Sequence, residues 1–184
     1  MMEFKPLLGN DVVNLAEALP LDMPISLMID PCNLCNFKCT FCPTGNKSLL
    51  GKYKRPKGMM SFELFEKILI NISNYQKNSS NKIKSLLLYK DGEPLLNRKL
   101  PEMITLAKKL NVAKHVLVTT NASLLDNSYS ERLLNSGLDS LRVSIQSLKK
   151  ESFSKITRTN FDYEKIKENI KNFNNIKKKL NKKT

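Results

Sequence analysis

The sequence predicts an α/β fold built on a parallel sheet, in a chain of 184 residues. Short apolar runs alternate with longer segments whose apolar residues recur at helical spacing. Turn-forming or polar residues follow each apolar run. An alternation of strand and helix is typical of parallel sheets with right-handed crossovers, and such sheets bind ligands at the carboxyl ends of their strands. We therefore expect one site at one edge of the sheet.

Four apolar runs are predicted to be strands. The first follows Pro24 and precedes Pro31, and we expect it to be buried. The second contains three consecutive leucines, and the third contains Val-Leu-Val. These runs cover residues 25–29, 83–89, 116–118 and 141–145. Continuous apolar runs of this length favour strands that are covered on both faces.

The segments between the strands carry helix signals. A short helix over residues 12–19 should stop at Pro20. The later helices are expected to begin at caps or an early proline: Ser61, Pro101, a Ser128/Glu131 capping box, and Asp162. A short polar segment, with no element assigned, separates the fourth strand from the last helix. The prediction is four strand–helix units in sequence.

Polar residues follow the predicted strands at the points where ligands bind in such sheets. Cysteines follow the first strand, and Thr120-Asn121 follow the third. The second strand ends at a turn, and the fourth ends in hydroxyl and amide side chains; these residues are Asp91-Gly92-Glu93-Pro94, Ser144 and Gln146. We expect them to converge on a single site.

Composition excludes some classes and leaves others open. Hydrophobic residues make up 41% of the chain, but no apolar run is long enough to span a bilayer or to serve as a leader over residues 1–8. We expect a cytoplasmic protein without a membrane partner. The net charge is +14, yet only five of the 31 basic residues are Arg. Solvated lysines explain this charge better than a nucleic-acid surface, which favours the planar guanidinium of Arg.

The four cysteines form the pattern C-x2-C-x3-C-x2-C from Cys32 to Cys42. Clustered cysteines in a reducing compartment indicate a metal site or a redox pair rather than structural disulfides. Structural zinc sites usually separate two C-x2-C pairs by a longer spacer. The bacterial ferredoxin run has its gaps in another order. A redox C-x-x-C pair is possible but does not need four cysteines.

The spacing C-x3-C-x2-C of Cys35, Cys39 and Cys42, with Phe41 before the last, resembles the radical S-adenosylmethionine (SAM) superfamily. This resemblance implies that the three thiolates ligate a [4Fe-4S] cluster and leave one iron open for SAM. One electron then cleaves SAM, and a 5′-deoxyadenosyl radical abstracts hydrogen from a substrate. Cys32 is an additional thiol, read as a spare residue or, less favourably, as a cluster or redox residue.

Other segments carry the same resemblance. Gly92 and Glu93 are similar to the family motif that contacts the amino group of SAM. Asn121 stands in a Thr-Asn-Gly-like motif in which Ala122 replaces the usual Gly. Ser144 lies where the fourth strand of the family faces the SAM ribose or carboxylate, and Arg158 where many members pair with that carboxylate. The resemblance therefore implies that these five residues contact the cofactor. Ala122 departs from the family motif, which usually has Gly there.

The resemblance also implies architecture and partners. The family core is a partial (β/α) TIM-like barrel of six units, of which this chain carries about four, so we expect a lead-in over residues 1–24 and a truncated core over residues 25–184. A weaker similarity links it to members with SPASM-type domains. The implied partners are a peptide or small-molecule substrate, a reductant such as flavodoxin or ferredoxin, and a region completing the barrel. A non-catalytic iron–sulfur remnant and a zinc-dependent nucleic-acid binder stay as alternatives.

Overall fold

The computed structural model describes residues 14–46, 48 and 56–184, and its centre is one parallel sheet of four strands in chain order. Leu27 lies opposite Leu86, and Val118 lies opposite Leu141. The strands are β1 (Ser26–Met28), β2 (Ser85–Leu87), β3 (His115–Thr120) and β4 (Ser140–Val143). The predicted α/β class is confirmed, and the sheet is open, as in a partial TIM-like barrel.

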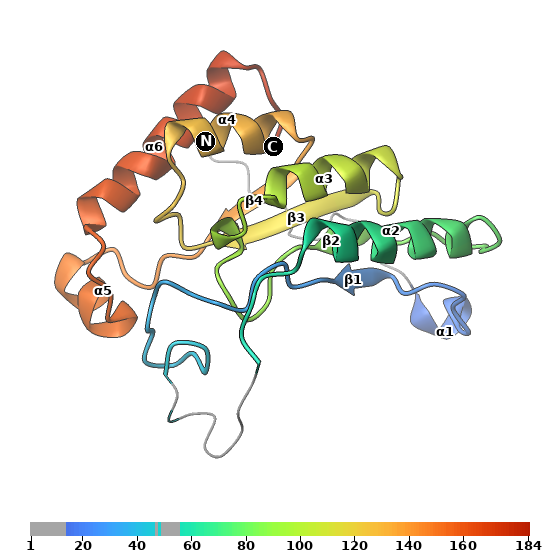
Figure 1. The fold of residues 1–184 in the computed structure, drawn as a ribbon, viewed down its shortest axis with the longest axis horizontal. Helices are drawn as coiled ribbons and strands as arrows, with labels where there is room; N and C mark the ends of the chain where they lie inside the picture. Colours follow the sequence, from blue (N-terminus) through green and yellow to red (C-terminus); the bar gives the residue numbers. More distant parts are fainter. Residues whose placement is uncertain (1–13, 47, 49–55) are drawn as a thin grey trace.

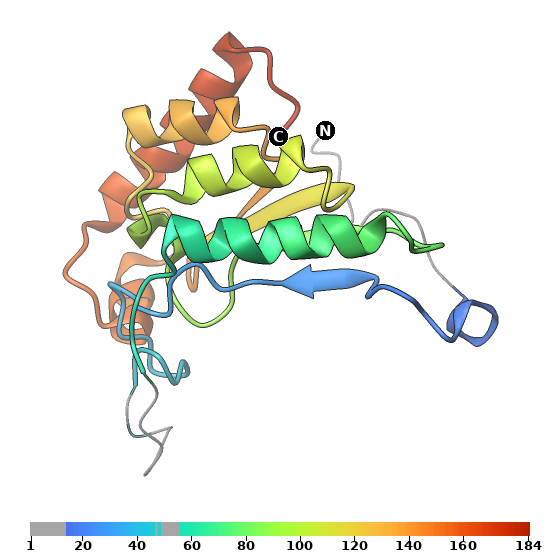
Figure 2. The same cartoon turned by 45° about the vertical axis from the view of Figure 1, so that its right-hand side comes forward.

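The helices lie mainly on one side of this sheet (Figures 1 and 2). Four of them pack in series, α2 on α3, α3 on α4 and α4 on α6. Their bounds are α2 (Phe62–Gln76), α3 (Leu100–Lys109), α4 (Asn127–Asn135) and α6 (Tyr163–Lys179), with the shorter α1 (Leu15–Ala18), η2 (Pro94–Leu96) and α5 (Lys150–Thr157) at the ends of the sheet. Figure 1 shows α5 and η2 at the carboxyl ends of the strands and α1 at the opposite end.

The core lies between the sheet and these helices. Alternate residues in the strands and directly after β2 face the helices and are fully buried, among them Leu86, Leu88, Val116 and Val118. They pack in one cluster with helix residues such as Met103. Each such side chain contributes about 1.5–3 kcal/mol by leaving water. The core thus lies on the helix-covered face of the sheet, and the carboxyl edge is free to carry a site.

The first strand differs from its prediction. β1 was expected to be buried, but Ser26 is exposed and the Met28 side chain is 46% exposed. Only Leu27 packs partly against the core. β1 is an edge strand, and the helices cover only one face of the sheet. Its apolar run therefore reflects one covered face rather than two.

The helix starts show which local signals were correct. Ser61 and Asp162 cap α2 and α6 as predicted, each accepting a hydrogen bond from a first-turn N–H. The Ser128/Glu131 capping box is wrong: the N-cap of α4 is Asp126, whose carboxylate accepts from Tyr129 N at 2.7 Å. Asp126 also places a negative charge at the helix N-terminus, which adds to its advantage as a cap.

Two further predictions changed in detail. The polar segment after the fourth strand contains the eight-residue helix α5, which has no side-chain cap at its start. Of the helix expected over residues 12–19, the structure shows α1, which begins at Leu15 and ends at Ala18, one residue before the predicted end; residues 12 and 13 lie outside the described residues. Among the described residues, no helix is both long and apolar enough to cross a membrane.

Candidate functional site

The predicted cysteines lie on residues 32–46, which we call the cysteine loop. Its first residues are held by a short antiparallel pairing with a later segment. Cys32 forms a bridge with Met59. Asn33 N donates to Gly58 O at 3.2 Å, and Asn33 Oδ1 accepts from Gly58 N at 2.8 Å. This pairing closes the loop at its base.

The turn after β2 packs directly under the cysteine loop. Glu93 N donates to Leu34 O at 2.8 Å. A Cβ atom at Gly92 would lie 2.0 Å from Cys32 O and 2.5 Å from Leu34 O, closer than real Cβ contacts allow. Glycine is therefore required at position 92 by the close approach of two backbones. The first and second strand ends are joined at this point.

The Glu93 carboxylate joins the second strand end to the third. Only 2% of Glu93 is exposed. Its oxygens accept hydrogen bonds from Thr120 Oγ1 at 2.6 Å, Asn121 N at 2.8 Å and Leu95 N at 3.0 Å. Burial raises the pKa of Glu93, while the bonds from Asn121, Thr120 and Leu95 lower it. The carboxylate is thus engaged inside the protein.

A ring of three side chains connects the third strand end to the cysteine loop. Asn121 Nδ2 donates to Asn36 Oδ1 at 2.9 Å, and Asn36 Nδ2 donates to Ser123 Oγ at 2.7 Å. Ser123 Oγ closes the ring by donating to Asn121 Oδ1 at 2.6 Å. Ala122, within this turn, has φ of 61°. That left-handed conformation favours glycine, in keeping with the Gly usual at this position in the resembling motif.

The helix that follows β4 receives the other side of the loop. Lys38 N donates to Thr157 O at 3.0 Å, and Thr40 N donates to Ile156 O at 2.9 Å. The last carbonyls of a helix lack partners within the helix, so these bonds satisfy the end of α5. Two cysteine-loop amides are thereby fixed against residues that lie 119 (157 − 38) and 116 (156 − 40) positions later in the chain.

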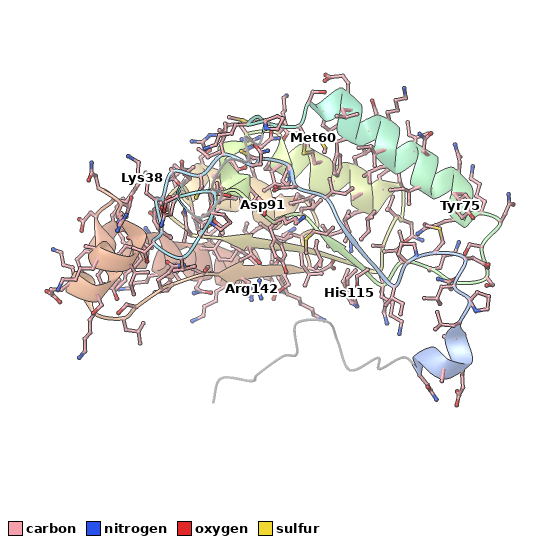
Figure 3. All side chains as sticks on the ribbon, turned by 90° about the horizontal axis from the view of Figure 1, so that it is seen from below. Lys38, Met60, Tyr75, Asp91, His115 and Arg142 are labelled. Carbon is pink, nitrogen blue, oxygen red and sulfur yellow. The ribbon has the colours of Figure 1, made fainter. Side chains whose placement is uncertain are left out.

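Aromatic packing supports the same contact. The Phe37 side chain is 2% exposed and meets Phe153 edge-on, with ring centroids 6.0 Å apart and an interplanar angle of 84°. Edge-to-face pairs of this kind contribute about 0.5–1.5 kcal/mol beyond burial. Figure 3 shows Lys38 of the loop and His115, where β3 begins, toward opposite ends of the sheet. The loop is therefore fixed at the carboxyl edge.

The three predicted ligands are free thiols. Cys39 is buried, and Cys35 and Cys42 are half-buried. Burial raises the pKa of the Cys35 thiol to about 11, and the charges of Glu93, Cys39 and Cys42 add to this. Burial also raises the pKa of Cys39. Burial thus opposes the thiolate forms of Cys35 and Cys39, and a bound metal would compensate that charge.

The fit of the three thiols to an iron–sulfur cluster rests on their chemistry. Within the described ranges, no three or more His, Cys, Asp or Glu side chains form a group that could hold a single metal ion. In an iron–sulfur cluster each thiolate binds its own iron, so the ligands need not meet at one point. Soft thiolates also suit iron–sulfur clusters. The donor set of Cys35, Cys39 and Cys42 therefore fits a cluster.

Cys32 occupies a different environment from the other three. It is 1% exposed in the pairing at the base of the loop. Its thiol donates to Leu34 O at 3.6 Å, and burial raises its pKa. This placement is that of a packed residue, the first of the two predicted roles.

Two predicted contacts lie at the rim of the site. Ser144 N donates to Thr120 O at 2.8 Å, and the exposed Ser144 Oγ accepts from Gln146 Nε2 at 2.9 Å. Arg158 is exposed directly after α5, with φ of 46°. Gly92, Glu93 and Asn121 are thus in direct contact with one another or with the loop, whereas the side chains of Ser144 and Arg158 border it.

The sequence did not indicate several supporting residues. Asn97 is buried, and its Nδ2 donates to Pro31 O at 2.9 Å and to Met60 O at 3.0 Å, bracing both sides of the loop base. Asn36 and Phe37 hold the loop through Ser123 and Phe153, which lie far along the chain. The position of Asn36 and Phe37 between two cysteines was the one available signal.

Comparisons with known proteins identify the family to which this chain belongs. Residues 29–181 match the Radical SAM superfamily. The chain belongs to the radical SAM superfamily. It is 34% identical over 139 residues to a probable GTP 3′,8-cyclase of Methanococcus aeolicus, covering 74% of this chain and 42% of that protein. It is 31% identical over 134 residues to the GTP 3′,8-cyclase of Clostridium botulinum, covering 72% and 38%.

Solved structures share the fold of this radical SAM chain. Native anSMEcpe with bound AdoMet has a TM-score of 0.66 at 23% identity, covering 84% of this chain and 42% of that one. BtrN in complex with AdoMet and 2-DOIA has a TM-score of 0.55 at 16% identity, covering 79% and 55%. The chain thus spans less than half the length of the curated relatives named above. The similarity to SPASM-containing members is not confirmed and stays a prediction.

Proposed function

We propose that this radical SAM chain binds a [4Fe-4S] cluster through Cys35, Cys39 and Cys42, and binds SAM beside it. The observation that supports this most is the attachment of a three-thiol loop to the ends of β2 and β3 and to α5. When bound, the cluster and SAM would supply the electron and the 5′-deoxyadenosyl radical that abstracts hydrogen from a substrate. The role of the protein is to hold the ligands and exclude water.

We assign the contacts to SAM according to which groups are already hydrogen-bonded within the protein. The Glu93 carboxylate already accepts three hydrogen bonds, and its amide donates to Leu34 O, so we assign the contact of this motif to the Gly92 backbone, with Glu93 holding the turn in place. The exposed Ser144 hydroxyl can bind a ribose or carboxylate oxygen, and the exposed Arg158 guanidinium can pair with the carboxylate. Asn121 acts through the loop, because its side chain is used in the ring with Asn36.

The substrate and partners belong to the same proposal. The curated relatives are named for GTP, and one solved neighbour holds a peptide, so a nucleotide or a peptide is a reasonable hydrogen donor. A reductant such as flavodoxin or ferredoxin would supply the electron. A reducing compartment such as the cytoplasm would keep the four thiols free. A region completing the barrel would cover the open sheet.

One experiment tests this function. The full chain is reconstituted anaerobically with iron and sulfide, reduced with dithionite and supplied with SAM, and 5′-deoxyadenosine is measured. Cys39→Ala should abolish the product, while Cys32→Ala, in the buried base of the loop, should retain it. A cluster without product would favour the second candidate, a non-catalytic iron–sulfur subunit. Stoichiometric zinc without a cluster would contradict both.

A further inference from the structure

The face of the sheet opposite the helices carries a row of three side chains at one level. Thr119 on β3 is paired in register with Arg142 on β4. Leu87 is paired with Leu117, so Tyr89, two residues after Leu87, is level with Thr119. Figure 3 shows Arg142 on the side of the sheet away from α2. The row therefore lies on the face that a barrel would enclose.

Arg142 is held in place by its neighbours rather than by an opposite charge. Its Nε donates to Thr119 Oγ1 at 3.1 Å, and its guanidinium carbon lies 5.3 Å from the centre of the Tyr89 ring. The residue is exposed. Among the residues that the structure describes, no carboxylate pairs with it. A guanidinium has five N–H donors, so most of them stay available.

A second arginine shows how an ordinary surface residue differs. Arg132 also lies over a tyrosine, 5.5 Å from the centre of the Tyr129 ring. Unlike Arg142, it pairs with Glu102 at 3.0 Å. Both arginines are exposed and stacked, but among the residues with described positions only Arg132 of the two pairs with a carboxylate. The carboxylate partner is therefore what distinguishes the two arginines, and a bound anion would take its place at Arg142.

The position of Arg142 places that ligand near the proposed SAM site. Arg142 is two residues before Ser144, so the two side chains lie on the same face of the sheet, roughly 7 Å apart along the strand. A guanidinium whose Nε is already fixed presents its outer N–H groups as a fork, which suits a carboxylate or phosphate. Fixing it beforehand reduces the entropy lost on binding.

We infer that Arg142 binds an anionic oxygen group of the substrate, a phosphate or a carboxylate, against the inner face of the sheet. Calling that molecule the substrate rests on the proposed function, whereas the anion site rests on the contacts of Arg142 itself. Thr119 and Tyr89 are positioning residues, because they touch Arg142 and not the anion.

The test measures anion binding to the full reconstituted chain by calorimetry, with inorganic tripolyphosphate and citrate as probes. The wild type should bind one of them, and the one that binds identifies phosphate or carboxylate. Arg142→Gln should weaken that probe by about tenfold or more, because the charge-assisted hydrogen bonds to the anion are lost. Arg142→Lys should lose part of the affinity with the fork. Thr119→Val, which keeps every charge, should weaken the same probe by a smaller factor.

Arg132→Gln is the matched control, because it removes the same charge from a paired arginine and should leave both probes unaffected. The inference is overturned if neither probe binds the wild type, if Arg142→Gln binds as tightly as the wild type, or if Arg132→Gln weakens binding equally. It is also overturned if Arg142→Gln loses SAM instead of the probes. Iron content and SAM affinity are measured alongside: a chain without a cluster that still shows the Arg142 effect would fail the proposed function and retain the anion site.

Discussion

Asn121 Nδ2 donates to Asn36 Oδ1 at 2.9 Å, which joins the end of β3 to the middle of the cysteine loop across 85 positions of the chain. Asn36 lies between Cys35 and Cys39, so this bond acts where the ligands are. Ser123 closes the ring with both amides. The position of the cysteine loop therefore depends on this contact with the end of β3, and the loop sequence alone does not fix it.

Energetic coupling between these two amides is the first prediction. Asn36→Ala and Asn121→Ala should each lower the free energy of unfolding by about 1–3 kcal/mol, because each leaves polar partners unsatisfied. The double variant should lose less than the sum, with a coupling of about 1 kcal/mol. Urea unfolding of the four proteins measures this. As a control, Asn36→Ala combined with Asn160→Ala, an exposed residue, should be additive; additivity in the Asn36/Asn121 pair would contradict the ring.

Two glycines provide a matched pair. Gly92→Ala places a methyl group 2.0 Å from Cys32 O, so the cysteine loop has to move, and we expect a loss of about 3 kcal/mol in the free energy of unfolding. The iron bound after reconstitution should fall as well. Gly58→Ala has nothing within 4 Å of its added methyl and should change neither quantity. Equal behaviour of the two variants, in urea unfolding and in iron content, would show that the contact at Gly92 is not required.

The buried carboxylate gives a third prediction. Glu93→Gln keeps the shape but turns an NH2 group toward a backbone or hydroxyl donor, leaving that donor unsatisfied. The free energy of unfolding at neutral pH should fall by about 1–3 kcal/mol. Glu131→Gln on the exposed side of α4 should change it by less than about 0.5 kcal/mol. A Glu93→Gln protein as stable as the wild type would mean that the carboxylate is not the link between the strand ends.

The pH dependence of the same pair follows from the direction of the pKa shift. Burial raises the pKa of Glu93 in the folded protein above its ordinary value of 4.5, so the folded state holds this proton more tightly than the unfolded state. The contribution of Glu93 to stability is then complete at pH below the unfolded pKa and declines as pH rises through the folded pKa. The stability of the wild type relative to Glu93→Gln should fall between acidic and neutral pH. A difference that grows with pH would show that the three hydrogen bonds outweigh burial.

Much of the fold could be predicted because its signals are local. The apolar runs of β2 and β3 and the stripe of α2 depend on neighbours within one element. The strand ends were then brought together by the general rule for parallel sheets. The burial of β1 was not local: its apolar run is compatible with one covered face or two, and the position of β1 at the sheet edge decides between them.

The candidate site divides in the same way. Cys35, Cys39 and Cys42 are recognisable by spacing, and Gly92 by its motif. Asn97 carries no comparable signal, because its partners lie 66 and 37 positions away. The structural role of the Glu93 carboxylate could not be predicted either. A glutamate after a strand suggests a contact to the cofactor, and only its three hydrogen-bond donors show that it links parts of the chain.

Electron paramagnetic resonance of the reduced, reconstituted protein, recorded with and without SAM, tests the central claim most directly. A [4Fe-4S] cluster contains iron and sulfide in equal amounts, so the reconstituted chain should contain them in that ratio. Three thiolate ligands would leave one iron open, so the cluster signal should change when SAM is added. Cys32→Ala should behave as the wild type, and Cys35→Ala, Cys39→Ala and Cys42→Ala should each lose the signal. A cluster signal that SAM leaves unchanged, or a signal that depends equally on Cys32, would contradict the assignment of three ligands and an open iron.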